Sequence, residues 1–217
     1  MDDLFADQPL ELPASTRLAE GAWLLRARAL PESGILIDAV EHIALQAPFR
    51  QLITPGGRQM SVETTSSGRY GWVSDQQAGY RYTTHDPVSG HPWPAIPECI
   101  HRLAYEAAQE AGYDNFTPDT CLINRYAPEA RMSLHQDKDE RDMQWPIVSI
   151  SLGLTAMFQF GGATRQAPVR DVPLLHGDIV VWGGPSRLFF HGIKPLKWGE
   201  HPQTGECRLN LTLRRTH

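Results

Sequence analysis

The C-terminal half of the chain is a succession of short segments in which apolar and polar residues alternate. The clearest of these segments are residues 147–152, 156–160 and 207–214. Alternation with a period of two places successive side chains on opposite faces of a β-strand. Glycine pairs at 161–162 and 183–184, and the turn sequence at 176–178, separate the segments. Seven or eight short strands with such punctuation predict an antiparallel sandwich, most simply a jelly roll.

Two segments of the N-terminal half have the periodicity of amphipathic helices. The first begins at residues 31–33 and stops before Ala47. The second runs from Pro97, which suits a first helical turn, to Gly112, which suits the left-handed position after a last one. We therefore expect a mainly β protein with flanking α-helices. The predicted apolar faces are Ile35, Ile37, Val40, Ile43 and Ala44 in the first helix, and Ile100, Leu103, Ala104, Ala107, Ala108 and Ala111 in the second.

The rest of the N-terminal half lacks a helical period and is rich in polar residues, prolines and glycines. Residues 1–20 are polar with two prolines and are predicted to form an irregular arm, followed by a first strand at 22–25. Between residues 49 and 93, glycines and polar residues separate short β-prone pieces at 60–62, 70–73 and 80–83. This pattern predicts hairpins that lie over the core rather than strands inside it.

The length and net charge of the chain limit the number of domains and the kind of nucleic-acid binding that it can have. A chain of 217 residues suits one domain that buries its own core. The net charge of −5 is not the strongly basic balance expected of a protein that wraps duplex DNA. It leaves room for a local patch that contacts a few phosphates, to which Lys138, Arg131, Arg165 and Arg58 could contribute.

Two features indicate the cellular compartment. The N-terminus has acidic residues where a signal peptide has basic ones, and no apolar run approaches the roughly 20 residues of a membrane span. Cys99, Cys121 and Cys207 are odd in number and lack a zinc-binding spacing, so buried, reduced thiols are expected. Together these features predict a cytoplasmic protein.

The first candidate functional residues are His135 and Asp137. Side chains two positions apart on an extended strand point the same way, so this imidazole and this carboxylate share a face. His191 follows an apolar stretch on a distant predicted strand and supplies a second imidazole. Two histidines and one carboxylate leave half of a metal's coordination sphere open, which is typical of non-haem Fe(II) oxygenases. Zinc also accepts this set, and a zinc hydrolase could use Asp139 or Glu140 as its general base.

Two arginines on the last predicted strand favour the oxygenase over the hydrolase. Arg208 and Arg214 are six positions apart, so both face one side of the strand, together with Asn210 and Thr212. A hydrolase has no need of two cations beside its metal, whereas 2-oxoglutarate presents two carboxylates that guanidinium forks can bind. The alternative is a pair of solvated arginines on an edge strand. A polar stripe that faces a core, however, requires a ligand or polar partners.

Six segments, in the same order along the chain, resemble the AlkB-type Fe(II)- and 2-oxoglutarate-dependent dioxygenases that repair alkylated nucleic acid. They are NRY at 124–126, LHQDKDE at 134–140, SISLG at 149–153, FQFGG at 158–162, HGD at 176–178 and RLNLTLR at 208–214. Residues 48–94 also resemble the nucleotide-recognition lid of the bacterial prototype. The resemblance implies a single oxygenase domain over residues 1–217, with an arm at about 1–20, a β-hairpin lid at about 48–94 and a double-stranded β-helix (jelly roll) core at about 116–217.

The same resemblance implies the metal and the co-substrate pocket. His135, Asp137 and His191 match the ligands of Fe(II), and 2-oxoglutarate and O2 are the implied co-substrates. In the family, the arginine at the position of Arg208 pairs with the distal carboxylate of 2-oxoglutarate. The arginine at the position of Arg214 approaches the carboxylate beside the keto group. The full set implied for the pocket is Asn124, Tyr126, Arg208, Asn210 and Arg214.

Substrate contacts follow from the resemblance in the same way. The implied set is Trp72, Tyr80 and Tyr82 from the lid, with Asp139 and Arg165 at base-contacting positions. Trp72 and His135 would sandwich a flipped base, and Asp139 would attract a base that carries positive charge. The lid departs from the prototype in two places. There is one extra residue near positions 77–78, and Thr64 stands where the prototype has a bulkier apolar residue.

The activity that the resemblance implies is oxidative demethylation of N-alkylated bases such as 1-methyladenine and 3-methylcytosine, with 2-oxoglutarate decarboxylation and release of formaldehyde. The implied partner is alkylated single- or double-stranded DNA, with RNA as an open alternative, and a monomer is expected. Two other functions stay open. One is a 2-oxoglutarate-dependent hydroxylase of a protein side chain or small metabolite, which the negative charge favours. The other is a non-catalytic jelly-roll module that binds a ligand without iron.

Overall fold

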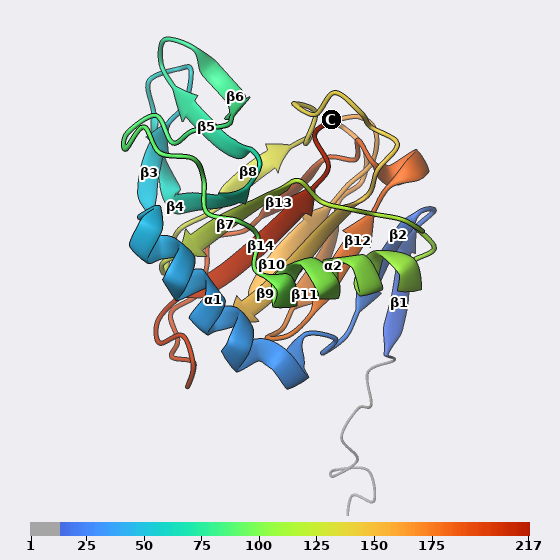
Figure 1. The fold of residues 1–217 in the computed structure, drawn as a ribbon. Helices are drawn as coiled ribbons and strands as arrows, with labels where there is room; N and C mark the ends of the chain where they lie inside the picture. The colour runs from blue at the N-terminus through green and yellow to red at the C-terminus, as the bar shows by residue number, and fades with distance from the viewer. Residues whose placement is uncertain (1–13) are drawn as a thin grey trace, which may run out of the picture.

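Two antiparallel sheets face each other, and two helices cover the outer side of the larger sheet (Figure 1). The structure is a computed structural model that describes residues 14–217. The strands are β1 (Ser15–Ala19), β2 (Ala22–Leu25), β3 (Arg50–Ile53), β4 (Gln59–Gly68), β5 (Gly71–Asp75), β6 (Gly79–Thr83), β7 (Thr120–Tyr126), β8 (Met132–His135), β9 (Ile147–Gly153), β10 (Ala156–Phe160), β11 (Arg170–Leu174), β12 (Ile179–Trp182), β13 (His191–Ile193) and β14 (Arg208–Arg214). The helices are α1 (Ser33–Gln46), α2 (Glu98–Glu110) and the short 3-10 turns η1 (Leu30–Glu32) and η2 (Gly184–Ser186).

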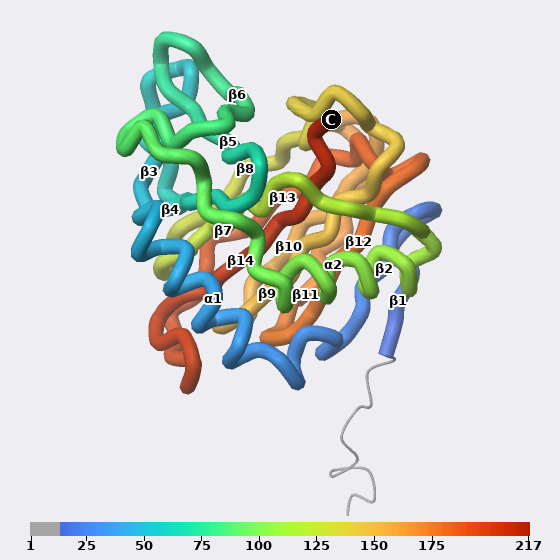
Figure 2. Tube along the Cα trace, viewed as in Figure 1, coloured from blue at the N-terminus to red at the C-terminus, as the bar shows by residue number. Residues whose placement is uncertain are grey.

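The sheet order confirms the predicted jelly-roll core. The large sheet has the order β1-β2-β12-β9-β14-β7-β4-β3, and the small sheet has the order β11-β10-β13-β8. Strands that are neighbours in space are distant in sequence, as where β14 lies between β9 and β7. The trace in Figure 2 shows that the chain end after β14 passes beside the loop that follows β8. There the Arg141 amide donates to the Thr216 carbonyl at 3.1 Å.

Strand β14 divides the interior into an apolar side and a polar side. Leu209, Leu211 and Leu213 pack in the cluster that the large sheet forms with α1 and α2. The alternate residues of β14 are polar or charged and face the small sheet, where they are buried as well. The strand is central rather than at an edge, so the alternative of solvated arginines is wrong.

Both predicted helices form, with one error in the buried face of the first. All six predicted apolar residues of α2 are buried, and Gly112 follows the helix with a left-handed φ of 88°. In α1, Ile35 is 59% exposed and its neighbour Leu36 is fully buried. The prediction chose the wrong member of an apolar run, since 33–37 offers two phases of the helical period.

Two predictions about the N-terminal half are wrong. Residues 15–19, expected in the irregular arm, form β1 at the edge of the large sheet, where they pair with β2. The piece at 60–62, expected in an overlying hairpin, belongs to β4, which pairs with β7 inside the large sheet. Only β5 and β6 form the separate hairpin that was expected of this region, and we call it the lid hairpin. The rest of the predicted arm, residues 1–13, lies outside the described residues.

Two further findings concern the predicted compartment. No helix within residues 14–217 is long and apolar enough to cross a membrane. The three cysteines are free thiols, but only Cys121 is buried, while Cys99 and Cys207 are partly exposed. Burial raises the pKa of the Cys121 thiol to about 12, so it stays protonated and unreactive.

An ion pair holds the segment beneath the lid hairpin. Arg50 donates to both carboxylate oxygens of Asp86, at 2.6 and 2.7 Å, and Ser89 and the Val88 amide add hydrogen bonds to the same carboxylate. Asp86 is buried. The hydrogen bonds from Arg50 lower the pKa of Asp86 from 3.8 to about 2. The charged form of Asp86 therefore stabilises the folded state.

This ion pair makes a prediction for acid stability. A carboxyl group with a depressed pKa stabilises the fold above its unfolded pKa, near 4, and loses that contribution as the pH falls toward 2. Asp86→Asn should therefore lower the free energy of unfolding at pH 7 by about 2 kcal/mol and flatten its decline between pH 4 and 2. Denaturant melts across pH measure both effects. Asp171→Asn, which breaks an exposed pair with Lys194, is the control and should cost less than about 1 kcal/mol.

Candidate active site

The two histidines of the predicted metal site face each other across neighbouring strands of the small sheet. His135 ends β8 and His191 begins β13, and the two residues are cross-strand partners with ring centroids 4.4 Å apart. Asp137 follows two residues after His135, beyond the end of the strand rather than on it. One ligand atom from each of the three lies within 4.8 Å of the others. The structure thus brings the predicted metal ligands together.

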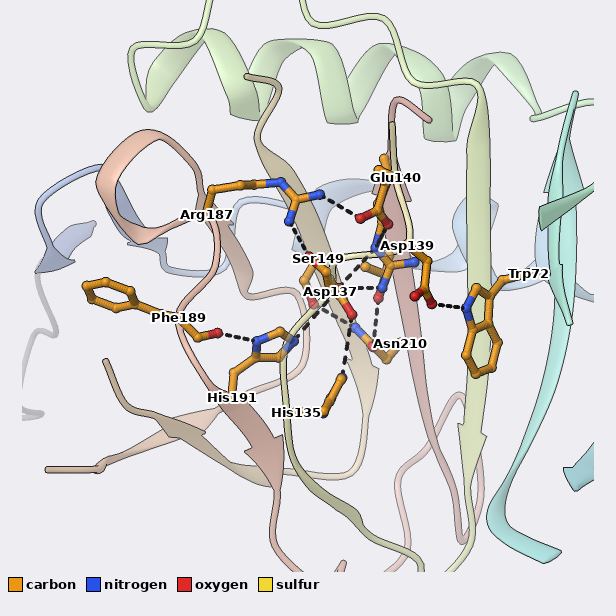
Figure 3. Close-up of polar contacts among 12 residues, drawn as sticks. Trp72, His135, Asp137, Asp139, Glu140, Ser149, Arg187, Phe189, His191 and Asn210 are labelled. Carbon is orange, nitrogen blue, oxygen red and sulfur yellow. Dashed lines mark hydrogen bonds and ion pairs between the residues drawn. The ribbon is translucent and has the colours of Figure 1, made fainter. Parts of the chain in front are cut away.

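Hydrogen bonds orient both imidazoles toward the carboxylate, as Figure 3 shows for His191. The Nδ1 of His135 lies 2.9 Å from the Ser133 carbonyl, and that of His191 lies 3.0 Å from the Phe189 carbonyl. A carbonyl only accepts, so each Nδ1 carries a proton, and in the neutral form of each ring the lone pair lies on Nε2. Those Nε2 atoms lie 3.6 and 3.8 Å from the oxygens of Asp137. Each ring is therefore in the tautomer that a metal ligand needs.

The charge states also suit a cation. Burial by itself would raise the pKa of Asp137, but Arg214 and the two imidazoles hold that pKa well below its usual range. Burial, together with the neighbouring His135, lowers the pKa of His191 to about 4, so this imidazole is neutral near pH 7. The site therefore offers a carboxylate and a neutral imidazole, which are the forms that bind metals.

Behind Asp137, a buried cluster of charges joins the predicted Arg214 to two residues outside the predicted site, Glu140 and Arg187. Arg214 donates to Oδ2 of Asp137 from Nη2 at 2.6 Å and from Nε at 3.0 Å. Glu140, which the zinc-hydrolase alternative offered as a general base, is buried and pairs with Arg187 at 3.0 Å (Figure 3). No pattern marked Arg187, because a single arginine in a loop carries no periodicity. The sequence did not distinguish Glu140 from its neighbours Lys138 and Asp139, which are exposed.

The predicted co-substrate residues share one face of two central strands. On β7 and β14, Tyr126 is opposite Arg208 and Asn124 is opposite Asn210. The guanidinium of Arg208 lies 5.1 Å from the centre of the Tyr126 ring and donates to Ser151 at 3.0 Å. Its Nε and Nη1 are buried and have no hydrogen-bond partner among the described residues, and neither has Oδ1 of Asn124.

The unpaired atoms of Arg208 and Asn124 show whether the residues of this pocket could bind 2-oxoglutarate. Buried guanidinium nitrogens without partners destabilise a fold, and burial here lowers the pKa of Arg208. A carboxylate placed on its free nitrogens removes that cost, and Arg214 lies at the other end of the same strand face beside the metal ligand. A dicarboxylate and a ferrous ion on two imidazoles and a carboxylate therefore fit the residues present.

Asn210 contributes in a different way from the other pocket residues. Its amide nitrogen donates to Ser149 at 2.8 Å and to the Ile150 carbonyl at 3.1 Å, and Thr212 donates to its oxygen at 3.1 Å. Both the nitrogen and the oxygen of the Asn210 amide therefore have hydrogen-bond partners within the protein. The two serines of β9 that partner Asn210 and Arg208 were quoted within a motif but were not predicted as site residues.

The predicted substrate residues of the lid hairpin face the segment after His135. The indole nitrogen of Trp72 donates to Asp139 at 3.0 Å (Figure 3). The Trp72 ring also stacks on Tyr80 at a centroid distance of 5.2 Å. Tyr82 instead donates its hydroxyl to the buried Glu140 at 2.6 Å. A cavity of about 240 Å3 separates the hairpin from β4, and Thr64 and Trp72 are among its lining residues.

Arg165 reaches the site from the opposite side. Its Nη1 donates to the Leu134 carbonyl at 3.0 Å, next to His135, and its guanidinium lies 4.9 Å from the centre of the Phe190 ring. The side chain is exposed, so it is available to a bound molecule. All of the predicted site residues therefore lie in one region, between the small sheet, the central strands and the lid hairpin.

Comparisons with known proteins agree with this geometry. The sequence model of the 2OG-Fe(II) oxygenase superfamily matches residues 28–214. The alpha-ketoglutarate-dependent dioxygenase AlkB of Escherichia coli (strain K12) is 55% identical over 215 residues, which cover 99% of this chain and 97% of that protein. The DNA N(6)-methyladenine demethylase ALKBH1D of Arabidopsis thaliana is 32% identical over 184 residues, which cover 73% of this chain and 40% of that protein.

A solved structure extends the agreement to the fold. The structure of OsALKBH1 superimposes with a TM-score of 0.81 at 28% identity, covering 93% of this chain and 99% of that one. The metal-binding trio, the arginine-lined pocket and these relatives lead to one assignment. The chain belongs to the 2OG-Fe(II) oxygenase superfamily and, within it, to the AlkB family of 2-oxoglutarate-dependent dioxygenases.

Proposed function

We propose that this enzyme removes small alkyl groups from the ring nitrogens of nucleic-acid bases, such as 1-methyladenine and 3-methylcytosine in DNA. The observation that carries the proposal is the contact between Trp72 and Asp139 at 3.0 Å. It sets an aromatic face and a carboxylate two residues beyond the metal ligand Asp137. An aromatic surface stacks on a base, and a carboxylate attracts a base that alkylation has made cationic. Relatives named for AlkB and for DNA demethylation support the same substrate class.

Different residues of the site bind the metal, bind the co-substrate and exclude water. Bound Fe(II), with 2-oxoglutarate and O2, supplies the oxidation of the alkyl carbon, after which the base and an aldehyde separate. His135, Asp137 and His191 would hold the ion, as a ligand set of this kind leaves positions open for 2-oxoglutarate and O2. Arg208 and Arg214 bind and orient the two carboxylates of 2-oxoglutarate. Trp182, buried and 5.0 Å from the His191 ring, helps to exclude water from the centre.

The substrate must leave its duplex to reach this centre. A base that cannot pair is extruded at lower free-energy cost than a normal base, and from a single strand at lower cost still. Trp72 and His135 would hold the extruded base between their rings, a contact worth about 1–3 kcal/mol per base for stacking. Arg131 and Lys138 are exposed on either side of His135, where they can contact backbone phosphates.

We infer four finer properties on the same basis. Single strands are the better substrates because they need no extrusion, and RNA is accepted because stacking does not depend on the sugar. A monomer suffices, since every residue assigned to the reaction comes from one chain. A cytoplasmic location suits the three free thiols. Rates on matched single and double strands, rates on matched DNA and RNA strands, sedimentation and cell fractionation test these points in turn.

The test of the proposed function is a mass measurement on a defined oligonucleotide. The protein is incubated with Fe(II), 2-oxoglutarate and air, together with a single strand that carries one 1-methyladenine. We expect the strand to lose the mass of one methylene unit, and an unmethylated strand to stay unchanged. A methylated strand of unchanged mass, beside an active relative that repairs it, would reject the proposal.

Asp139 makes a prediction about the charge of the preferred base. Asp139→Asn removes a negative charge but keeps an acceptor for the Trp72 indole. We expect kcat/KM to fall about fivefold on cationic 1-methyladenine and 3-methylcytosine, in line with an exposed ion pair of about 1 kcal/mol. The rate on neutral 3-methylthymine should change little. Equal losses on both kinds of base would mean that Asp139 acts by holding Trp72 rather than by its charge.

A further inference from the structure

The hydroxyl of Tyr82 is turned toward the protein interior rather than toward the place of a bound nucleotide. It lies on β6 of the lid hairpin and donates to Oε1 of Glu140 at 2.6 Å. Burial raises the pKa of Tyr82 well above its ordinary value, so the phenol remains a donor over the working pH range. The hairpin is thereby attached to a residue of the core by a short hydrogen bond to a charged group, the stronger kind.

Glu140 is surrounded by groups that also hold the metal site. Its side chain is 1% exposed, and its carboxylate lies 3.0 Å from Nη2 of Arg187 and 3.4 Å from Nε of Arg214. A carboxylate this deeply buried is stable only when its lone pairs are satisfied. Arg187 also donates to the backbone carbonyl of Asp137 at 2.7 Å. Glu140 thus contacts the lid hairpin directly and is connected to the backbone of a metal ligand through Arg187.

Arg214 completes the connection. It lies between two carboxylates, with Nη2 at 2.6 Å from Oδ2 of Asp137 and Nε at 3.4 Å from Oε1 of Glu140. The same Glu140 oxygen accepts the hydrogen bond from Tyr82. The proposed function assigns this guanidinium to the 2-oxoglutarate carboxylate beside the keto group. A continuous chain of polar contacts therefore runs from the lid hairpin to the co-substrate and the metal ligand.

We propose that Glu140 is a positioning residue that couples docking of the lid hairpin, through the Tyr82 hydroxyl, to binding of 2-oxoglutarate at Arg214. The inference rests on the proposed function and deepens it. When the hairpin is docked, Tyr82 satisfies one oxygen of Glu140, and Arg214 stays placed between Glu140 and Asp137. When the hairpin lifts, that oxygen is hydrated and the guanidinium is free to shift.

The coupling works in both directions by thermodynamic necessity. If docking of the hairpin tightens 2-oxoglutarate binding by some factor, 2-oxoglutarate favours the docked hairpin by the same factor. The enzyme would then close its lid preferentially once the co-substrate is in place. The proposed coupling also gives the Tyr82 hydroxyl a role in the core, while Trp72 and Tyr80 remain the lid side chains that face a base.

The experiment is hydrogen–deuterium exchange of residues 71–83, without nucleic acid. The protein is loaded with Mn(II), which occupies the same ligands without consuming 2-oxoglutarate, and exchange is followed with and without saturating 2-oxoglutarate. We expect 2-oxoglutarate to slow exchange in the wild-type hairpin at least about fivefold, the lower end of usual coupling. In Tyr82→Phe the slowing should vanish, and the 2-oxoglutarate Kd from calorimetry should rise by the same factor.

Tyr80→Phe is the matched control. It removes a hydroxyl from the same strand and keeps the ring that stacks on Trp72, so the response to 2-oxoglutarate should survive. Unchanged protection in β9 and β14 shows that each variant is folded. A Tyr82→Phe hairpin that responds like wild type, or a wild-type hairpin that ignores 2-oxoglutarate, overturns the proposal. Because no nucleic acid is present, these results are independent of whether the dealkylation assay succeeds.

Discussion

Replacing His135 by alanine is expected to abolish turnover by removing one of three metal ligands. Loss of a residue that only orients a ligand weakens metal binding by about 10–100-fold, so loss of the ligand itself should exceed about 100-fold. The structure adds a reason, since the His135 imidazole also neighbours Asp137 at 3.6 Å and His191 at a centroid distance of 4.4 Å. Anaerobic titration with Fe(II) measures the affinity, and succinate formation measures turnover.

The control for this variant is His42→Ala. His42 is exposed on α1, and its imidazole bonds only to the Asp38 carbonyl of its own helix. Iron affinity and turnover should stay at wild-type values in it. His135→Ala also separates an enzyme from a binding module, because a module would keep its function without the imidazole. Succinate formation at the wild-type rate by His135→Ala would show that the metal is bound elsewhere.

The second large effect is expected at Arg208. Arg208→Ala should raise the KM for 2-oxoglutarate by about 100-fold or more, which corresponds to about 3 kcal/mol for a desolvated charge pair. Saturating 2-oxoglutarate should restore much of kcat, because Arg208 binds the carboxylate remote from the metal. Steady-state kinetics at varied 2-oxoglutarate measure both constants. An unchanged KM would mean that another cation binds the distal carboxylate.

Two comparisons support the interpretation of that result. Arg125→Ala, on the neighbouring strand, removes an exposed arginine paired with Glu63 and should leave the KM unchanged. Arg208→Met fills the same space without charge. Because Nε and Nη1 of Arg208 have no partners among the described residues, the ligand-free Met variant should be at least as stable as wild type. A large loss of stability would mean that Arg208 serves the fold rather than the co-substrate.

The sequence alone predicted those elements and site residues whose pattern depends directly on local geometry. Alternation placed β9, β10 and β14, and helical period with proline and glycine at its ends placed α2. Spacing put His135 beside Asp137 and put Arg208 and Arg214 on one face. The central position of β14 could not be read from its own residues, because it depends on strands that are distant in the chain. For that reason β1 was missed and β4 was placed outside the core, since polar residues can form strands when neighbours supply the hydrogen bonds.

The buried charges show the other limit of sequence reasoning. Glu140 lies in a segment where Lys138 and Asp139 are exposed, and nothing in that run distinguishes it. Its burial results from Arg187 and Tyr82, which approach from a loop after β12 and from the lid hairpin. Pairs of this kind are set by tertiary packing, and no local period predicts them. The resemblance to a family gave the ligands of the site but not this connection between its parts.

The most direct test of the whole account measures two products in one reaction. The enzyme is supplied with Fe(II), limiting O2, 2-oxoglutarate and a 1-methyladenine strand, and succinate and formaldehyde are quantified together. We expect the two products in equal amounts, with both absent from His135→Ala. Succinate formed while the methyl group stays on the base would contradict this expectation, because the oxidation would then act on something other than the nucleic acid.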